Sequence, residues 1–290
     1  MHDGVNILSI QSQVVYGHVG NGAAGPALQR MGCEVWALPT AILSHHPGHG
    51  PPAGRPLPPA EIAALAASLA DRGLLRACSA LLTGWLGTPE TAEQVLVLQA
   101  RLRADNPAAV WLCDPVIGDR PKGVYVDPAL VAAFRDRLLP RADIATPNCF
   151  ELELLADRPI QTLNDALTAA RTVIARGTGC VVCTSLLRRD RRPEVIESLA
   201  VASDGAWLAQ TPSLNDVPNG AGDLFASVFL GRFLRKRSVK KALAYAVAVT
   251  YGVLRASVGG TGPLPKELKL VAAQSEIARP SHDPWIQRVG

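Results

Sequence analysis

The stretch NGAGDLFASVFLGRFL, which begins at Asn219, joins a glycine-rich turn to a long apolar run. This pattern predicts the start of a helix, where free backbone N–H groups and the helix dipole favour a negatively charged ligand. Asp223 places a carboxylate at the same helix start. Because a carboxylate can take a proton from an attacking hydroxyl group, the motif could combine an anion site with a general base. A tight turn with a simple helix cap is the alternative interpretation.

Further polar side chains stand where predicted strands end. In an open parallel sheet, ligands bind beyond the carboxyl ends of the strands, so residues at several strand ends can converge on one ligand. Four motifs fall at such positions: CDPVIGD, TPNCFELELL, CTS and NGAGD. Apart from Asp223, the candidate site residues that they supply are Asp114, Thr146, Asn148, Glu151, Thr184 and Ser185.

Each of these motifs also has a purely structural interpretation. Asn148 could be the N-cap of a helix, with Glu151 three residues later completing a capping box. Asp114 could be a turn residue before Pro115, and Thr184 and Ser185 could be loop hydroxyls. The joint occurrence of the motifs favours a site over four unrelated structural features.

The elements that must position these residues follow from the apolar pattern. Short apolar or β-branched runs alternate with helix-length segments, which predicts a mostly parallel sheet covered on both faces. The expected strands are 5–10, 34–40, 79–84, 109–114, 143–147 and 180–185. The expected helices between them are 20–31, 59–72, 89–104, 128–138, 148–156 and 162–176.

The C-terminal third predicts a different arrangement. Strands near 195–201 and 206–210 should form a hairpin, followed by helices at 219–236, 238–257 and 264–278, the last with Pro263 and Pro265 near its start. No linker divides the chain, so residues 1–290 are expected to form a single domain. The Gly- and Pro-rich stretch within about 44–59 predicts a surface flap.

Composition excludes several classes of function. The 290 residues carry a formal net charge of +4, which is too small to argue for nucleic-acid binding. No charge-free segment of 18 residues predicts a membrane span, and no signal peptide is apparent. The six cysteines are scattered along the chain. We therefore expect a soluble cytoplasmic protein that acts on small molecules.

Two motifs are easily misread. GNGAAG, at Gly20, matches a dinucleotide fingerprint, but about ten residues separate it from the preceding strand, whereas the fingerprint must follow its strand directly. A helix packed closely on the sheet through small residues is the preferred interpretation. Cys180 and Cys183 form a C-x-x-C within a strand-like run, where they should point to opposite faces, so buried structural thiols are expected.

Taken together, the motifs resemble a known family. NGAGD with N-x-x-E upstream is similar to the ribokinase-like superfamily, and ILSIQSQVVYGHVGNGAAGPALQRMGCEVWALPT is similar to the start of pyridoxal kinases. LLTGWLGT, CDPVIGDRPKGVYV and VAAQSEIARP also resemble that family, particularly its bacterial branch. The resemblance implies a ribokinase-like three-layer α/β/α fold without a large lid domain. It also implies MgATP-dependent phosphorylation of the 5′-hydroxymethyl group of pyridoxal, by an enzyme that is often a homodimer.

The resemblance carries roles onto matching positions. Asp223 resembles the catalytic base, and Gly220, Ala221 and Gly222 resemble the anion hole. The nucleotide and Mg²⁺ side corresponds to Asp114, Thr146, Asn148, Glu151, Thr184 and Ser185, with Asp114 and Glu151 as the metal candidates and Glu151 acting through water, since Mg²⁺ sheds water reluctantly. The substrate side corresponds to Ser12, His46, Pro47, Gly48 and Trp85.

The flap departs from the family pattern. Relatives usually read S-N-H-T-x-Y-G, whereas this chain has SHHPGHG, so Pro47 replaces a threonine expected to touch the substrate. Three histidines there, His45, His46 and His49, also allow a metal site as the less favoured interpretation. Two alternatives for function stay open: a kinase of a related heterocycle such as hydroxymethylpyrimidine, and a vitamin-binding or regulatory protein with little kinase activity.

Overall fold

The computed structural model describes residues 4–120, 122–259 and 266–290. Strands β1, β2, β4, β5, β8 and β9 correspond to the six strands expected in the first two thirds of the chain. Their bounds are β1 Val5–Val14, β2 Cys33–Leu43, β4 Cys78–Thr83, β5 Val110–Cys113, β8 Ile144–Ala145 and β9 Cys180–Leu186. The hairpin is formed by β10 Val195–Ala202 and β11 Gly205–Pro212, paired antiparallel as expected.

Four short strands were not anticipated from the sequence. They are β3 Gly54–Pro56, β6 Gly118–Asp119, β7 Gly123–Val124 and β12 Trp285–Arg288. None of the four is an apolar run. β3 and β12 are the outermost strands of the main sheet, and β6 and β7 form a separate two-stranded ribbon. The segment expected to be a surface flap therefore contains an edge strand, which pairs antiparallel with β2.

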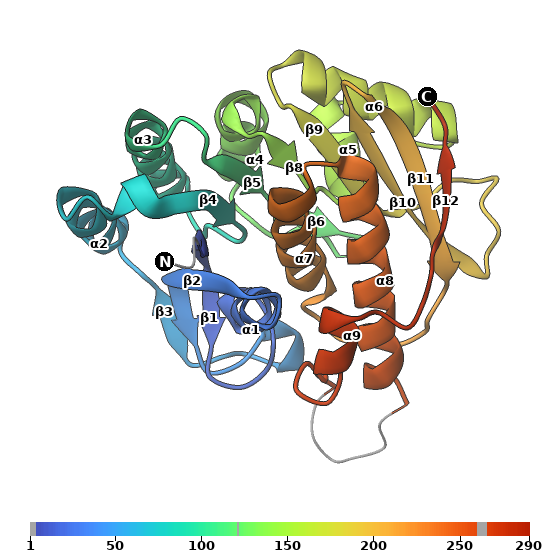
Figure 1. Ribbon diagram of the computed structural model, residues 1–290, viewed down its shortest axis with the longest axis horizontal. Coiled ribbons are helices and arrows are strands. Elements are labelled where there is room, and N and C mark those ends of the chain that lie inside the picture. Colours follow the sequence, from blue (N-terminus) through green and yellow to red (C-terminus); the bar gives the residue numbers. More distant parts are fainter. Residues whose placement is uncertain (1–3, 121, 260–265) are drawn as a thin grey trace.

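One sheet of ten strands organises the described chain, in the order β12-β11-β10-β9-β8-β5-β4-β1-β2-β3 (Figure 1). The six strands from β9 to β2 are parallel, and the strands at the two ends are antiparallel. The carboxyl ends of all the parallel strands lie on the same side of the sheet, so the residues that follow these strands gather there.

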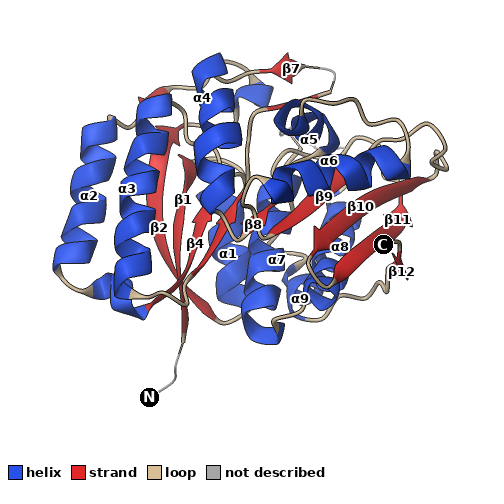
Figure 2. Cartoon of the chain, turned by 90° about the horizontal axis from the view of Figure 1, so that it is seen from above, coloured by secondary structure: helices blue, strands red, loops and turns tan. Residues whose placement is uncertain are grey.

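Helices cover both faces of the sheet, as expected for three α/β/α layers (Figure 2). The helices that follow the expected segments closely are α1 Asn21–Arg30, α2 Pro59–Asp71, α3 Pro89–Asp105, α5 Cys149–Ala156, α6 Leu163–Ala175, α7 Ala221–Lys236 and α8 Val239–Ser257. The segment 128–138 divides into α4 Pro128–Ala133 and a π-helical turn, Phe134–Leu138.

The last expected helix is much shorter than the sequence suggested. Only α9, Gln274–Ala278, is helical within 266–278, and Pro263 and Pro265 lie outside the described residues. Leu268 and Leu270 are buried without forming a helix, because both belong to the apolar core that also contains α7 and α8. The expectation of a helix over 264–278 was therefore wrong for its described first half.

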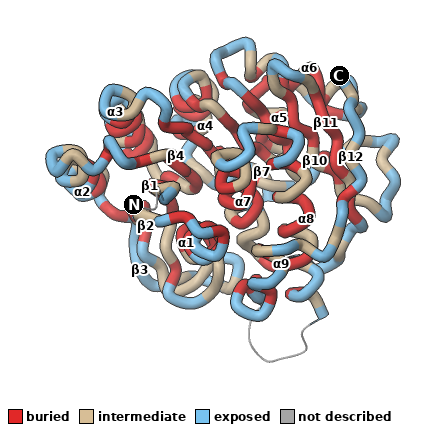
Figure 3. Tube along the Cα trace, in the orientation of Figure 1, coloured by how far each residue is buried: buried red, intermediate tan, exposed pale blue. Residues whose placement is uncertain are grey.

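Two apolar cores lie on opposite faces of the sheet. One joins the sheet to α2–α6, and the other joins it to α1 and α7–α9. In Figure 3 the buried residues lie mainly in the strands and on the inner sides of the helices, while exposed residues lie on the outer helices and loops. Cys183 belongs to the first core and Cys180 to the second, which confirms that they point to opposite faces. All six cysteines are free and buried.

The GNGAAG motif packs α1 onto the sheet as expected. The helix begins at Asn21, whereas β1 ends at Val14, so the motif does not follow its strand directly. Ala23, Ala24 and Ala27 are fully buried on this helix. Within the described parts of the chain, no helix is both long and apolar enough to cross a membrane.

Candidate active site

Asp223 lies in the first turn of α7, at the edge where the parallel strands end. No side chain caps this helix, so the amides of its first turn are not taken up by a capping group. Burial raises the pKa of the Asp223 carboxylate to about 6, although the nearby backbone N–H of Gly20 favours its ionised form. A carboxylate with a pKa near the working pH is suited to general base catalysis.

The turn before Asp223 requires glycine at position 220. Gly220 has φ 92°, and a Cβ there would lie 2.0 Å from the carbonyl oxygen of His18 and 3.1 Å from Leu268 Cδ1. A Cβ on Gly222 would lie 4.0 Å from Asp114 Oδ2, so Gly222 separates the helix start from Asp114 without blocking the gap. Gly220 therefore lets the β1–α1 loop approach the helix start, whereas a Cβ at position 222 would make only an ordinary contact with Asp114.

Asp114 follows β5 and is buried beside its neighbours. Thr146, just after β8, donates from Oγ1 to Asp114 Oδ1 at 2.9 Å. Burial raises the pKa of Asp114 well above its usual range, and the negative charges of Glu151 and Asp223 raise it further. These three carboxylates come from distant parts of the chain, and the structure brings them together.

Asn148 and Glu151 form the capping box that the sequence offered as a structural alternative. Asn148 Oδ1 accepts from the Glu151 N–H at 3.0 Å, and Glu151 Oε2 accepts from the Asn148 N–H at 2.8 Å. Glu151 Oε1 accepts in addition from the N–H groups of Ile117 (2.8 Å) and Gly118 (3.3 Å). Burial raises the pKa of Glu151 to about 7 despite these bonds. Glu151 thus fixes the loop after Asp114 as well as the start of α5.

Thr184 and Ser185 form a bulge near the end of β9. The pairing register with β10 shifts there, so two residues on β9 oppose one on β10. Ser185 has φ 48°, a left-handed conformation that is uncommon outside glycine. The Thr184 N–H donates to the Pro147 carbonyl at 2.9 Å, which joins this strand end to the loop before Asn148. Thr184 therefore lies beside the Asn148–Glu151 cap, and Ser185 directly follows Thr184 in the chain.

Ser12 lies in the last part of β1, against the loop that holds Asp223. A Cβ on Gly20 would come within 2.2 Å of the Ser12 carbonyl oxygen and 2.7 Å of its Oγ. A buried polar network supports this junction. Asn21 accepts from Ser9 Oγ (2.7 Å) and donates to the Gln11 carbonyl (3.1 Å), and Gln11 donates to Ser9 Oγ (2.9 Å).

Trp85 follows β4 and is held by neighbouring strands. Its carbonyl accepts from Thr40 Oγ1 at 2.7 Å, and a Cβ on Gly87 would lie 3.0 Å from its ring. The preceding Gly84 packs on Gln11, where a Cβ would meet Gln11 Oε1 at 2.5 Å. Trp85 therefore belongs to the strand end next to the one that carries Ser12.

The flap places His46, Pro47 and Gly48 close to the glycine turn. His46 caps a short 3₁₀ helix, Pro47–His49, and its Nδ1 accepts from the Gly48 N–H at 3.0 Å. A Cβ on Gly48 would lie 2.8 Å from Asn219 Nδ2. Burial lowers the pKa of His46, so its ring is neutral with Nε2 as the remaining donor.

Several residues at the site carried no recognisable sequence signal. They are the Gly20 N–H, the Ser9–Gln11–Asn21 network and Glu267. Their contacts join segments that are distant in the sequence, so no local pattern marks them. Burial raises the pKa of Tyr125, and the charges of Glu151, Asp119, Asp114 and Asp223 raise it further. Only the polar QSQ inside an apolar strand could have indicated the buried network.

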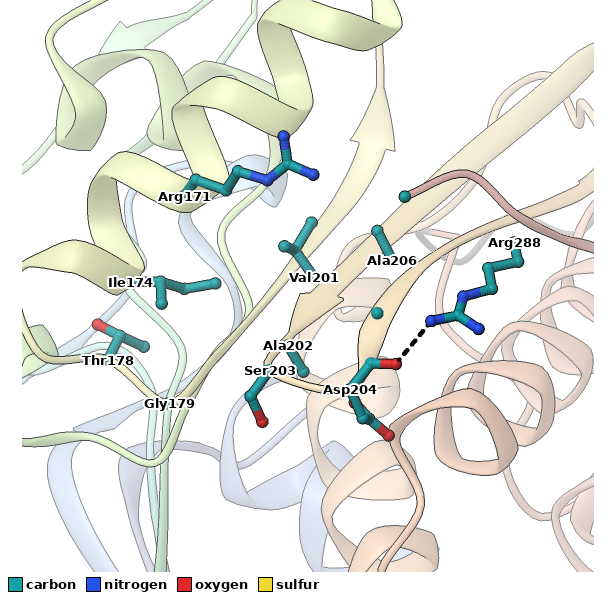
Figure 4. A pocket seen from close by; sticks show the side chains of 12 residues that line it. Arg171, Ile174, Thr178, Gly179, Val201, Ala202, Ser203, Asp204, Ala206 and Arg288 are labelled. Carbon is teal, nitrogen blue, oxygen red and sulfur yellow. Dashed lines mark hydrogen bonds between the residues drawn. The ribbon is translucent and has the colours of Figure 1, made fainter.

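A hollow of about 640 Å³ lies at the amino ends of the parallel strands, opposite the ends where the site residues gather (Figure 4). Thr178 and Gly179, before β9, and the β10–β11 turn line it together with Arg171 and Arg288. Arg288 is held there by donating to the Asp204 carbonyl at 3.2 Å. None of the predicted site residues lines this hollow, which lies at the amino end of β9.

The residues at the site fit Mg²⁺ with few direct protein ligands. Among the described residues, no group of three or more His, Cys, Asp and Glu side chains is placed to hold a metal ion directly, which applies to the flap histidines as well. The buried carboxylate of Asp114, destabilised by neighbouring negative charge, is suited to a cation that keeps most of its water and binds substrate phosphates.

Comparison with known proteins gives a consistent result. The family model described as phosphomethylpyrimidine kinase matches residues 27–264. The chain is 44% identical to the pyridoxal kinase PdxY of Rubrobacter xylanophilus over 96% of this chain and 95% of the relative. It is also 44% identical to the pyridoxal kinase PdxY of Deinococcus radiodurans, over 96% of this chain and 94% of the relative.

Structural comparison agrees with the sequence relatives. The pyridoxal kinase from Leishmania donovani, solved in complex with ADP and pyridoxamine, superimposes with a TM-score of 0.91 at 29% identity, covering 98% of this chain and 99% of the other. The expected fold is thereby confirmed as the one that pyridoxal kinases share. On its sequence and its fold together, the chain belongs to the pyridoxal kinase family.

Proposed function

We propose that this protein transfers the γ-phosphoryl group of ATP to the 5′-hydroxymethyl group of pyridoxal, which yields pyridoxal 5′-phosphate. The observation that carries the proposal is the Asp223 carboxylate in the first turn of α7, near the Gly20 N–H and beside the uncapped amides that begin the helix. The names of the relatives and the ADP and pyridoxamine bound by the Leishmania enzyme support the choice of substrates.

Asp223 acts in this proposal as the general base. Its carboxylate takes the proton of the attacking hydroxyl, while the amides of Gly220, Ala221 and Gly222 stabilise the negative charge on the transferring phosphoryl group. Phosphoryl transfer needs mainly alignment and charge stabilisation from the protein. Donors preset toward developing charge are worth about 3–4 kcal/mol when one is removed.

Asp114, Thr146, Asn148, Glu151, Thr184 and Ser185 form the nucleotide side in the same proposal. Asp114 is the best placed to act on Mg²⁺ because its buried carboxylate faces the helix start across Gly222. Glu151 acts on the ion through water and holds the loop at Ile117 and Gly118. When bound, Mg²⁺ neutralises phosphate charge during transfer.

Ser12, His46, Pro47, Gly48 and Trp85 form the substrate side. The neutral ring of His46, with Nδ1 occupied by the Gly48 N–H, presents its Nε2 as a donor to a ring substituent of the substrate. Pro47 offers neither a hydroxyl nor an N–H there. Ser12, next to Gly20, supplies a hydroxyl on the other side.

A second candidate substrate is a hydroxymethylpyrimidine. The matching family description names phosphomethylpyrimidine kinase, and Pro47 removes a side-chain contact that relatives are expected to make to pyridoxal. Both substrates present a hydroxymethyl group on a flat heterocycle, so the base and anion hole serve either.

The test is an ATP-consumption assay with pyridoxal, pyridoxine, pyridoxamine and hydroxymethylpyrimidine, with mass identification of each phosphorylated product. We expect pyridoxal 5′-phosphate to form with the highest kcat/KM. Preferred phosphorylation of the pyrimidine would select the second candidate. Substrate binding without turnover would instead favour a vitamin-binding or regulatory protein.

The same proposal includes the domain organisation, the oligomeric state and the cellular compartment of the enzyme. A single kinase domain over residues 1–290 that forms a homodimer in the cytoplasm agrees with the family resemblance. Exposed Val15 (83%) and Ile42 (47%) at neighbouring strand ends offer apolar surface for a partner, and six free thiols suit a reducing compartment. Light scattering and cell fractionation test these two points.

A further inference from the structure

The carboxylate of Glu267 joins two segments that are far from it in sequence. Its Oε1 lies 2.6 Å from Nε2 of His49, in the flap, and its Oε2 accepts from the His18 N–H at 2.9 Å, in the β1–α1 loop. The side chains of His49 and Glu267 are only 13% and 12% exposed. Gly17 provides the space for this carboxylate, because a Cβ at that position would come within 2.6 Å of the carboxyl group.

The flap end of this contact leads to the proposed substrate residues. The rings of His49 and His46 meet edge to face at 6.3 Å between centroids. His46 in turn accepts from the Gly48 N–H, and Gly48 lies against Asn219 at the glycine turn. Fixing His49 therefore limits where His46, Pro47 and Gly48 can lie.

The loop end leads to the base and the anion hole. The His18 carbonyl packs against Gly220, and the Gly20 N–H lies near the Asp223 carboxylate. Leu268, the next residue after Glu267, also packs against Gly220. One carboxylate thus holds the flap and the Asp223 loop in a fixed relation.

We propose that Glu267 is a positioning residue that docks the flap onto the β1–α1 loop, through His49 and the His18 amide, and so completes the pocket for the hydroxymethyl substrate. This inference rests on the proposed function for its substrate. Glu267 touches neither reacting atoms nor nucleotide in this account. Its loss lowers the fraction of molecules with a docked flap, and apparent affinity for the substrate falls by the same fraction.

Steady-state kinetics of four variants test the inference. Glu267→Ala and His49→Ala should each raise KM for pyridoxal roughly 10- to 100-fold, the range expected for a lost charge-assisted hydrogen bond, with KM for ATP unchanged. The double variant should be no worse than Glu267→Ala, because the two residues act as one unit. His45→Ala is the matched control, since His45 contacts Ser44 rather than Glu267, and it should keep the wild-type KM.

Glu267→Gln should keep the contacts of this side chain with His18 and His49. Its amide oxygen can accept from the His18 N–H and its NH₂ can pair with Nε2 of His49, so KM should stay within about threefold of wild type. Additive effects of the two alanine substitutions, or KM values for ATP and pyridoxal that rise together, would overturn the inference. If Glu267→Ala does not fold, His49→Ala in the flap decides alone.

Hydrogen–deuterium exchange of residues 44–56 gives a readout that needs no substrate. Exchange should accelerate in Glu267→Ala and His49→Ala and stay at the wild-type rate in His45→Ala. Unchanged exchange in all three would refute flap docking even if kinetics change. Accelerated exchange in an enzyme that does not phosphorylate pyridoxal would keep the docking role and reject only the proposed substrate.

Discussion

On the proposed nucleotide side of the site, Asn148 and Glu151 use their side-chain atoms on adjacent backbone groups, and every strand end is tied to the next. On the flap, Pro47 and Gly48 are exposed, and few contacts hold the segment to the rest of the site. The nucleotide side is therefore built before any ligand binds, whereas the substrate side depends on how well the flap docks. Changes to the two sides should accordingly differ in kind.

Asp223 stands between the two sides, and its replacement should have the largest effect. Asp223→Asn removes the base but keeps the size of the side chain, so kcat should fall about 10²- to 10⁴-fold. Titration calorimetry should still detect ATP binding. Asp204→Asn, in the exposed β10–β11 turn, is the control. Wild-type turnover in Asp223→Asn would remove this residue as the base.

The dependence of kcat/KM on pH provides a second test of the role of Asp223. Burial raises the pKa of Asp223 to about 6, so the carboxylate is ionised above that pH and protonated below it. Only the ionised form can accept the proton, so kcat/KM should rise between pH 5 and 7 and fall about tenfold per unit below pH 6. In Asp223→Asn the residual rate should lose this dependence.

Glu151→Gln should have an intermediate effect, and a second capping box supplies its control. Thr162 and Asp165 cap α6 with the same geometry, away from the site residues. Glu151→Gln should raise the Mg²⁺ concentration for half-maximal rate by about tenfold, in line with a lost outer-shell partner, whereas Asp165→Asn should not. Equal Mg²⁺ dependence in both variants would mean that Glu151 serves only as a cap.

Pro47→Thr should have the smallest effect, and it acts on the flap alone. A threonine restores a hydroxyl near the substrate, so KM for pyridoxal should fall about 2- to 10-fold, the value of one ordinary hydrogen bond, with kcat and KM for ATP unchanged. Pro51→Thr, at an exposed flap position, is the control. An unchanged or higher KM would indicate that another group already makes the contact.

The sequence predicted the layers and the strand-end motifs because both follow from local patterns. Apolar runs located the parallel strands within a few residues, and NGAGD and N-x-x-E located two helix starts. Edge strands such as β12 and the burial of Leu268 outside any helix were missed, since they depend on partners elsewhere in the chain. The contacts of Gly20 and Glu267 could not be found for the same reason, whereas the double role of Asn148 and Glu151 was visible as two alternatives.

The hydrogen bond between the His18 amide and Glu267 spans 249 residues. During synthesis at about 5–20 residues per second, the β1–α1 loop precedes Glu267 by about 12–50 s and the flap by about 11–44 s. Until that residue emerges, the nascent chain lacks the carboxylate that joins them, and it also lacks Asp223 for most of that time. The parallel half of the sheet can therefore assemble first, while completion of the substrate pocket is delayed until almost the whole chain has left the ribosome.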